Sequence, residues 1–163
     1  MEESVERVKE LAGSKAKENK KFFSRLKRLP SSKVDGLFHT AHDDVFQEFN
    51  CLDCANCCKS ISPIVLNRDV DKIAKALGMR PSEVISKYLF EDVDGQYAFR
   101  DTPCPFLDEE NLCLIYPNRP KACREYPHTD RKRMHQILNI TIKNIAICPV
   151  VFEVVERIKR NVK

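Results

Sequence analysis

Apolar residues recur every three or four positions over residues 5–29, which is the spacing of an amphipathic helix. Gly13-Ser14 interrupts this pattern and Pro30 stops it, because proline cannot continue a helix. The segment therefore predicts an amphipathic helix or a pair of helices. Its apolar positions are Val5, Val8, Leu11, Phe22, Phe23, Leu26 and Leu29.

The same period returns on either side of the middle of the chain. Residues 35–49 carry one broad apolar face and end two residues before Cys51. Residues 150–158 repeat valine and isoleucine at helical spacing directly after Cys148-Pro149, and proline is common at the first position of a helix. Helices are therefore expected toward both ends of the chain.

Two shorter helices are predicted in the middle of the chain. Residues 69–77 end at Gly78, and Arg80-Pro81 begins a second helix that continues to Leu89. A glycine after one helix and a proline at the start of the next are typical of two helices joined by a tight turn. The second helix carries few polar side chains that could read DNA bases, so recognition of DNA by this pair is disfavoured.

The pattern changes to short apolar and aromatic runs between residues 96 and 116. Tyr97–Phe99 and Leu112–Tyr116 are predicted as two strands of a hairpin that carries Cys104 and Cys113 near its connecting loop. Tyr116 is expected in the core. Together with the helices, this hairpin predicts a mostly helical α+β fold.

Composition is that of a compact folded domain. The chain has 163 residues, 42% of them hydrophobic, with four glycines, which disfavours disordered, collagen-like and coiled-coil structures. Residues 1–33 hold ten basic and five acidic residues, so the net charge of +4 arises there. We expect residues 1–33 to be a basic amphipathic helical extension and residues 34–163 to be a cysteine-cluster metal-binding domain. Binding of nucleic acid is disfavoured, because basic and acidic residues alternate and no nucleic-acid-reading motif accompanies them.

The location expected from the sequence is the cytoplasm. No stretch approaches the roughly 18 apolar residues of a membrane span, and Met1-Glu2-Glu3 is the wrong sign for a secretory leader. Structural disulfides are rare in that reducing compartment. Eight cysteines therefore favour a metal site over disulfides.

Four cysteines lie within eight residues of the chain: Cys51, Cys54, Cys57 and Cys58. The C-x-x-C step occurs twice in succession. Two intervening residues allow a turn to bring both sulfur atoms to one metal ion, at bond lengths near 2.3 Å. This spacing is the most specific signal in the sequence.

The remaining thiols are Cys104, Cys113, Cys123 and Cys148. Eight thiols divide into two sets of four, the number that ligates tetrahedral zinc or an iron-sulfur cluster. The adjacent side chains of Cys57 and Cys58 diverge, so they are expected in different sets. The predicted division is Cys51, Cys54 and Cys57 with one downstream thiol, and Cys58 with the other three; a single cluster with spare thiols is the alternative.

The sequence leaves the metal open between iron-sulfur and zinc. Bacterial ferredoxins use a C-x-x-C-x-x-C run and a later cysteine followed by proline, and this chain has the run, Cys104-Pro105 and Cys148-Pro149. This favours an iron-sulfur cluster, [4Fe-4S] before other types. Short-spaced thiolates are equally typical of structural zinc.

Two arginines and two histidines are further candidates around the thiols. Arg119 and Arg124 flank Cys123 and could offset the negative charge of metal-bound thiolates or hydrogen-bond to them. The alternative is a surface ion pair with Asp108, Glu109 or Glu125, which would contribute little stability. His39 and His42 have metal-capable spacing, but a solvated helix surface explains this pair better.

Three segments in order resemble one family. They are Cys51-x-x-Cys54-x-x-Cys57-Cys58, then Thr102-Pro103-Cys104-Pro105-Phe106-Leu107, then Leu112 to Pro127 with its C-x-I-Y-x-x-R-P and C-R-x-x-P elements. Over about residues 50–150 the chain resembles the YkgJ-type CxxCxxCC cysteine-cluster proteins, which are described as zinc- or iron-chelating, sometimes as iron-sulfur oxidoreductases, and as relatives of flagellin lysine N-methylases. The resemblance implies that all eight cysteines form the metal site.

The predicted function is that of a metal-binding protein whose eight cysteines hold an iron-sulfur cluster or zinc and organise a small core, with a redox role if the metal is iron. The alternatives are a zinc-stabilised structural or interaction module and a protein-modifying enzyme related to the lysine N-methylases. A thiol-disulfide protein is a third class. A partner is expected to be a protein or a redox partner, and the sequence indicates neither substrate nor oligomeric state.

Overall fold

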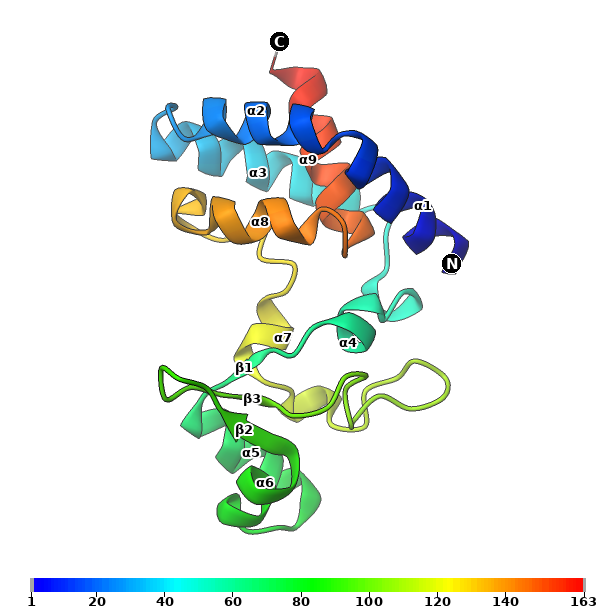
Figure 1. The fold of residues 1–163 in the computed structure, drawn as a ribbon, viewed down its shortest axis with the longest axis vertical. Coiled ribbons are helices and arrows are strands. Elements are labelled where there is room, and N and C mark those ends of the chain that lie inside the picture. Colours follow the sequence, from blue (N-terminus) through cyan, green and yellow to red (C-terminus); the bar gives the residue numbers. More distant parts are fainter. Residues whose placement is uncertain (1, 163) are drawn as a thin grey trace. The chain divides into compact units, whose positions relative to one another are not determined.

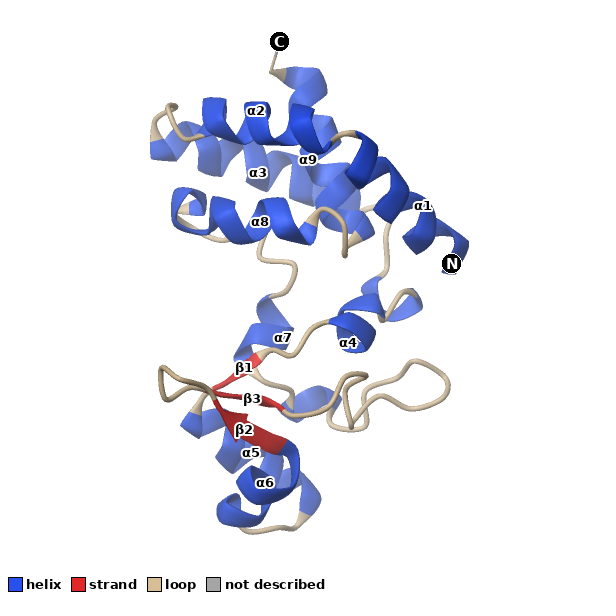
Figure 2. Cartoon of the chain, in the orientation of Figure 1, coloured by secondary structure: helices blue, strands red, loops and turns tan. Residues whose placement is uncertain are grey.

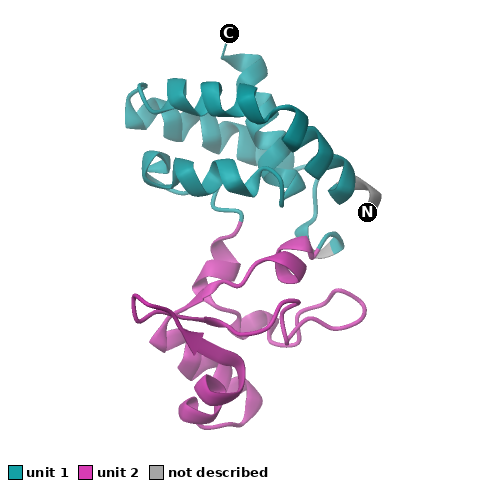
Figure 3. Ribbon diagram, viewed as in Figure 1, with its two compact units in different colours: residues 1–54, 127–163 teal, residues 55–126 magenta. Residues whose placement is uncertain are grey.

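The computed structural model describes residues 2–162, which form two compact units (Figure 3). Unit 1 contains Met1–Cys54 and Pro127–Lys163, and unit 2 contains Ala55–Tyr126. Figure 2 shows that unit 1 is built from helices and that the three strands belong to unit 2. The predicted mostly helical α+β class, with helices at both ends, is confirmed.

Unit 1 is a helical unit whose two chain segments pack together (Figure 1). Helix α3 packs against α9, and α2 packs against α8. Phe38 of α3 and Val154 of α9 are fully buried. The elements of unit 1 are α1 (Glu2–Ser14), α2 (Ala16–Leu26), α3 (Ser31–Phe46), η1 (Cys51–Asp53), η3 (Met134–Ile137), α8 (Leu138–Asn144) and α9 (Pro149–Asn161).

The helical pattern over residues 5–29 is a pair of helices, α1 and α2, with Lys15 between them. Phe22, Phe23 and Leu26 are buried, so the apolar side of α2 faces the core. The ammonium group of Lys15 pairs with Glu156 of α9. Residues 2–33 thus belong to α1, α2, the start of α3 and the short links between them within unit 1; a separate extension over residues 1–33 stays a prediction.

Helix α9 begins as the sequence indicates, with Pro149 at its first position after Cys148. Val150, Val151, Val154, Val155 and Ile158 are all buried, which is the apolar face expected from the spacing. None of the helices in residues 2–162 is by itself long and apolar enough to cross a membrane. The helical segments Met134–Asn144 and Pro149–Asn161, which meet at an angle of 116°, reach the length and apolar composition of a span only when taken together.

Asp35 of α3 fixes the start of η3. Its Oδ2 accepts the backbone N–H of Arg133 at 2.9 Å, and its Oδ1 accepts that of Met134 at 2.8 Å. Burial raises the pKa of Asp35, but these two hydrogen bonds and the positive charges of His39 and His135 outweigh it and hold the pKa below its ordinary value. The carboxylate therefore stabilises a backbone turn in which Arg133 has a φ of 61°.

Replacing Asp35 by alanine should destabilise unit 1 by about 1 kcal/mol, as the loss of a helix cap does. Because the folded pKa lies below the unfolded one, this contribution is fully present above the unfolded pKa and is lost as pH falls through the folded pKa. Thermal melting of both proteins should therefore differ at neutral pH and converge in acid. Asp43→Ala, an exposed change on the same helix, is the control; an equal loss in Asp43→Ala would contradict the capping role.

Unit 2 contains a small sheet with two helices against it. The strands lie in the order β1-β3-β2, and both pairings are antiparallel. Ala98 of β3 is opposite Ile64 of β1 and Phe90 of β2. The elements of unit 2 are α4 (Asn56–Ser60), β1 (Ile64–Val65), α5 (Asn67–Leu77), α6 (Pro81–Tyr88), β2 (Leu89–Glu91), β3 (Tyr97–Phe99), η2 (Tyr116–Asn118) and α7 (Lys121–Glu125).

The core of unit 2 is small, and most of its buried side chains come from helices and strands. The paired residues Leu89 of β2 and Phe99 of β3 are buried together with Val65 of β1 and Ile73 of α5. Cys104 and Cys113 are partly buried against this cluster. The thiol-bearing loops therefore share the apolar core of unit 2.

The predicted strand Tyr97–Phe99 is present as β3, but its hairpin partner is β2 and not Leu112–Tyr116. Strand β3 pairs with β2 through the turn around Asp94-Gly95, where Gly95 has a φ of 75°, and Leu112–Tyr116 forms no strand. The expectation that the second helix reaches Leu89 is wrong, because Leu89 begins β2. The Asp-Gly turn signal lies next to β3 and closes a shorter loop than the predicted pairing would.

Residues 107–115 form an irregular loop with one isolated bridge, between Leu107 and Cys113. The Asp108 carboxylate accepts the backbone N–H groups of Glu110 at 3.0 Å and Leu112 at 2.7 Å. Local side-chain hydrogen bonds of this kind compete with strand pairing. Tyr116, predicted in the core, is 42% exposed, so that expectation is wrong.

Candidate metal centres

The eight cysteines are all free thiols and are divided between the two units. Unit 1 contains Cys51, Cys54 and Cys148, and unit 2 contains Cys57, Cys58, Cys104, Cys113 and Cys123. Cys148 is buried, Cys51 is exposed and the others are partly buried. Each unit therefore has its own group of thiols.

Four different segments contribute the thiols of unit 2. Cys58 lies on the short helix α4, and its carbonyl accepts the backbone N–H of Cys104 at 2.8 Å, so these two segments are joined directly. Cys113 pairs with Leu107 in the loop that follows. Cys123 lies on α7, which contacts β1. These contacts thus bring together thiols of unit 2 that are far apart in the sequence.

The electrostatics of unit 2 show that four of its thiols are neighbours. Burial, together with negative charge on Cys58, Cys104 and Cys113, raises the pKa of Cys123 to about 12. Burial likewise raises the pKa of Cys104 to about 11, with the charges of Cys58 and Cys113 adding to the effect and backbone hydrogen bonds opposing it. Four thiolates gathered in one partly buried place repel each other unless a cation is bound among them.

Cys58 differs from the other three thiols. A hydrogen bond with Cys57, whose sulfur lies 4.0 Å from that of Cys58, lowers the pKa of Cys58 to about 7 against the opposing effect of burial. The positive charge of Arg119 contributes to this lowering of the Cys58 pKa. Cys58 is thus the thiol of this group most readily deprotonated near neutral pH.

Arg119 and Arg124, both predicted to act around Cys123, have different surroundings. Burial raises the pKa values of Cys58, Cys113 and Cys123, and the charge of Arg119 opposes this effect at all three thiols. Its guanidinium group lies 3.7 Å from the centre of the Tyr116 ring and donates to the Tyr116 carbonyl at 2.7 Å.

Arg124 instead donates to the Arg119 carbonyl at 2.6 Å. The alternative partner Glu125 pairs with Lys121. Arg119 is therefore the arginine whose charge acts on the thiols, and Arg124 contacts the backbone that carries it. A role of either residue toward a bound metal stays a prediction.

The three thiols of unit 1 also affect each other. Burial raises the pKa of Cys148 to about 11; the backbone amides of Val151 and Val150 oppose this, and charge on Cys51 and Cys54 adds to it. The backbone N–H of Cys54 donates to the Cys51 carbonyl at 3.2 Å, which closes the C-x-x-C turn. The start of α9 thus lies near the 51–54 turn.

Cys57 is predicted to share a metal ion with Cys51 and Cys54. It lies two residues after Ala55, whose backbone is left-handed with a φ of 47°. The structure assigns Cys57 to unit 2, next to Cys58. Its membership in the first set of ligands stays a prediction from the C-x-x-C spacing.

The donor set fits zinc or iron, because every candidate ligand is a sulfur atom. In the part of the chain that the structure describes, no three His, Cys, Asp or Glu side chains lie in a geometry that could hold a metal ion. Binding therefore requires the sulfur atoms within a group to approach one another.

His39 and His42 make hydrogen bonds within unit 1. The Nε2 of His39 lies 3.0 Å from the Arg131 carbonyl, and the Nδ1 of His42 lies 2.7 Å from the Thr129 hydroxyl. The His42 ring also stacks on Phe46 at 4.3 Å. Both rings thus connect α3 to residues 129–131.

Asp108, named from the sequence only as a candidate ion-pair partner of the arginines, shapes the loop that carries Cys113. Its two backbone hydrogen bonds and the left-handed Asn111, with a φ of 63°, define the turn before Cys113. Aspartate followed by asparagine three residues later, just before an apolar run, was the available signal.

A comparison with family models matches residues 50–146 to CxxCxxCC, described as "Putative zinc- or iron-chelating domain". The matched segment covers more than half of the chain and includes every cysteine except Cys148. Searches of the curated proteins and of the solved structures gave no match.

Proposed function

The chain belongs to the CxxCxxCC family of zinc- or iron-chelating domains, and on this premise we propose that unit 2 binds an iron-sulfur cluster through Cys58, Cys104, Cys113 and Cys123. One observation carries the proposal: the charges of the other three thiols all act on the desolvated Cys123. Four thiolates are the usual ligand set of such a cluster.

The sequence spacing supports iron-sulfur over other metals. The proline after Cys104 follows the ferredoxin pattern within the proposed ligand set, and the C-x-x-C-x-x-C run and the proline after Cys148 follow it among the other thiols. Arg119 adds a positive charge beside three of the four thiols. A nearby cation offsets the negative charge of a thiolate-ligated centre and is one means of setting its reduction potential.

The proposed function is electron transfer with a redox partner. A bound iron-sulfur cluster would supply a one-electron couple. The residues of this chain would supply its ligands, the partly buried surroundings of Cys104 and Cys123, and the charge of Arg119. Cys51, Cys54 and Cys148 would contribute to a second centre on unit 1.

A structural zinc site is the second candidate. The small core of unit 2 includes Cys104 and Cys113 among the side chains that pack against it. A closed set of four thiolates is typical of zinc that stabilises a fold. Zinc at these positions would make the chain an interaction module whose unit 2 folds with its metal.

The test is metal and acid-labile sulfide content on protein purified without oxygen. We expect about four iron atoms per occupied centre with an equal amount of sulfide, and a spectrum that bleaches on reduction. Zinc without sulfide would overturn the iron-sulfur proposal and support the structural one. Protein without metal whose thiols all react with a labelling reagent would contradict both.

A further inference from the structure

The loop 107–115 and the start of η2 expose three large apolar side chains. Leu112 is 45% exposed, Leu114 is 67% exposed and Tyr116 is 42% exposed. Between them in the chain, Cys113 and Ile115 pack into the core of unit 2. Single exposed apolar residues are ordinary on a protein surface, whereas three within five residues indicate an interaction surface.

Hydrogen bonds hold these side chains in place. The Asp108 carboxylate accepts the backbone N–H of Leu112 at 2.7 Å, and the backbone N–H of Asp108 donates to the Leu112 carbonyl at 2.9 Å. The backbone N–H of Leu114 donates to the carbonyl of the buried Phe106 at 2.9 Å. A surface that is already ordered loses little conformational entropy when a partner covers it.

Negative charge lies next to these apolar side chains. The turn at residues 108–110 is Asp-Glu-Glu, and Glu109 and Glu110 are exposed. None of the ion pairs within residues 2–162 involves either glutamate. The first basic residue after the turn, Arg119, stacks on the ring of Tyr116 instead. Uncompensated negative charge attracts a positively charged partner and raises the rate at which the two proteins meet.

The same segment carries a proposed ligand of the iron-sulfur centre. Leu112 and Leu114 are the neighbours of Cys113 on either side in the chain, and Cys113 is only partly buried. A protein that covers the two leucines therefore comes close to a ligand of the centre. Electron-transfer complexes are small, with less than roughly 1,200 Å² of buried surface. Three apolar side chains beside a charged turn suit an interface of that size.

We propose that Leu112, Leu114 and Tyr116, together with Glu109 and Glu110, form a docking surface for a one-electron carrier protein whose contact face is apolar at its centre and basic at its rim. The proposal rests on the iron-sulfur function proposed for unit 2. In each encounter one electron leaves the reduced protein and enters the oxidised one, and no covalent bond forms or breaks. The apolar contact holds the partner beside Cys113, and the two glutamates select a basic partner over an acidic one.

The probe is oxidised cytochrome c, a basic one-electron carrier, mixed in a stopped-flow instrument with the full chain after its cluster has been reduced. The rate constant for haem reduction should be high at low ionic strength and should fall as salt screens the charges. Plastocyanin with an acidic surface should react more slowly and gain rate with salt. Glu109→Gln with Glu110→Gln should lower the rate constant for cytochrome c about tenfold at low ionic strength.

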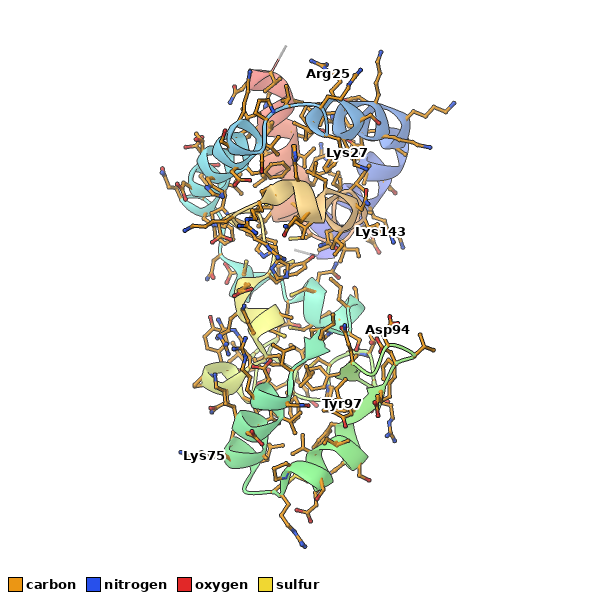
Figure 4. All side chains as sticks on the ribbon, turned by 90° about the vertical axis from the view of Figure 1, so that its left-hand side faces the viewer. Arg25, Lys27, Lys75, Asp94, Tyr97 and Lys143 are labelled. Carbon is orange, nitrogen blue, oxygen red and sulfur yellow. The ribbon has the colours of Figure 1, made fainter. Side chains whose placement is uncertain are left out.

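The turn between β2 and β3 supplies matched controls. Figure 4 labels Asp94 in this turn, and Figure 1 shows the turn and the loop 107–115 on opposite sides of unit 2. Glu91→Gln with Asp94→Asn removes the same charge from exposed positions there and should change the rate constant little. Leu114→Ser should lower the rate constant several-fold even at high ionic strength, whereas Val93→Ser, at a more exposed apolar residue in the turn, should not.

Iron and sulfide content and bleaching by dithionite are measured for every variant. A chain without a reducible cluster would overturn the iron-sulfur function and this proposal together. A reducible cluster with equal losses in the two double variants, or with no effect of Leu114→Ser, would overturn the docking surface alone. Self-association of the chain that Leu114→Ser abolishes would also overturn it, because the surface would then belong to a contact with a second copy.

Discussion

Replacing Cys123 by alanine should remove the metal of unit 2 and unfold that unit while the helices of unit 1 persist. Cys123 is the thiol on which the charges of Cys58, Cys104 and Cys113 converge. Structural metal binding contributes on the order of 10 kcal/mol in small domains, and a whole domain is stable by only about 5–15 kcal/mol. Three remaining thiolates cannot complete the ligand set, so most of that stabilisation is lost.

The measurement is metal content together with amide hydrogen exchange. Protection should fall across residues 55–126 and stay unchanged in the buried parts of α3 and α9, which serve as the internal reference. Lys121→Ala on α7 is the matched control, because its ion pair with Glu125 is exposed and contributes little. Full metal content and full protection in Cys123→Ala would sink the assignment of Cys123 as a ligand.

Removing the metal from the intact chain with a chelator should have a similar effect on unit 2. The core of this unit is small, and its loops carry Cys104 and Cys113 against that core. We expect partial loss of far-ultraviolet circular dichroism and recovery when the metal is returned. If dichroism and melting are unchanged after complete removal, the metal does not organise unit 2.

The affinity of unit 2 for its metal should depend on pH. The pKa values of Cys104 and Cys123 are raised to about 11 and about 12, so both thiols are protonated in the metal-free protein at neutral pH. Metal ligation requires thiolates and therefore releases these protons. Metal affinity should rise with pH and fall in acid, and titration in two buffers of different ionisation enthalpy would measure the protons released.

The sequence predicts the helices well because their apolar faces are long. Residues 5–29 and 150–158 each repeat the helical period, and the structure buries those faces in unit 1. Leu112–Tyr116 has a strand-like composition but forms a loop, because Asp108 hydrogen-bonds to the backbone that a partner strand would need. Short strands such as β1 and β2 leave too few alternations to be recognised.

The candidate site shows a similar limit. The spacing of the cysteines predicts a metal site and separates Cys58 from Cys51 and Cys54, whereas the surroundings of Arg119 depend on the fold. The sequence favours Arg124, which is directly next to Cys123, over Arg119, which lies four residues before it. The fold shows instead that the charge of Arg119 acts on Cys58, Cys113 and Cys123. Residues that are close in sequence can point in different directions, so neighbouring positions alone do not distinguish them.

The insertion of unit 2 into the chain of unit 1 has a consequence for the rate of folding. Helices α3 and α9 contact each other across the whole of residues 55–126, so forming that contact first would require closing a long, flexible loop. In folded unit 2, α7 near its end contacts β1 near its start, which holds the two ends of the insertion close together. Contacts distant in sequence slow folding. Early ordering of unit 2 by its metal would therefore shorten the effective loop and speed the assembly of unit 1, so metal supply during synthesis would influence how quickly the helical unit forms.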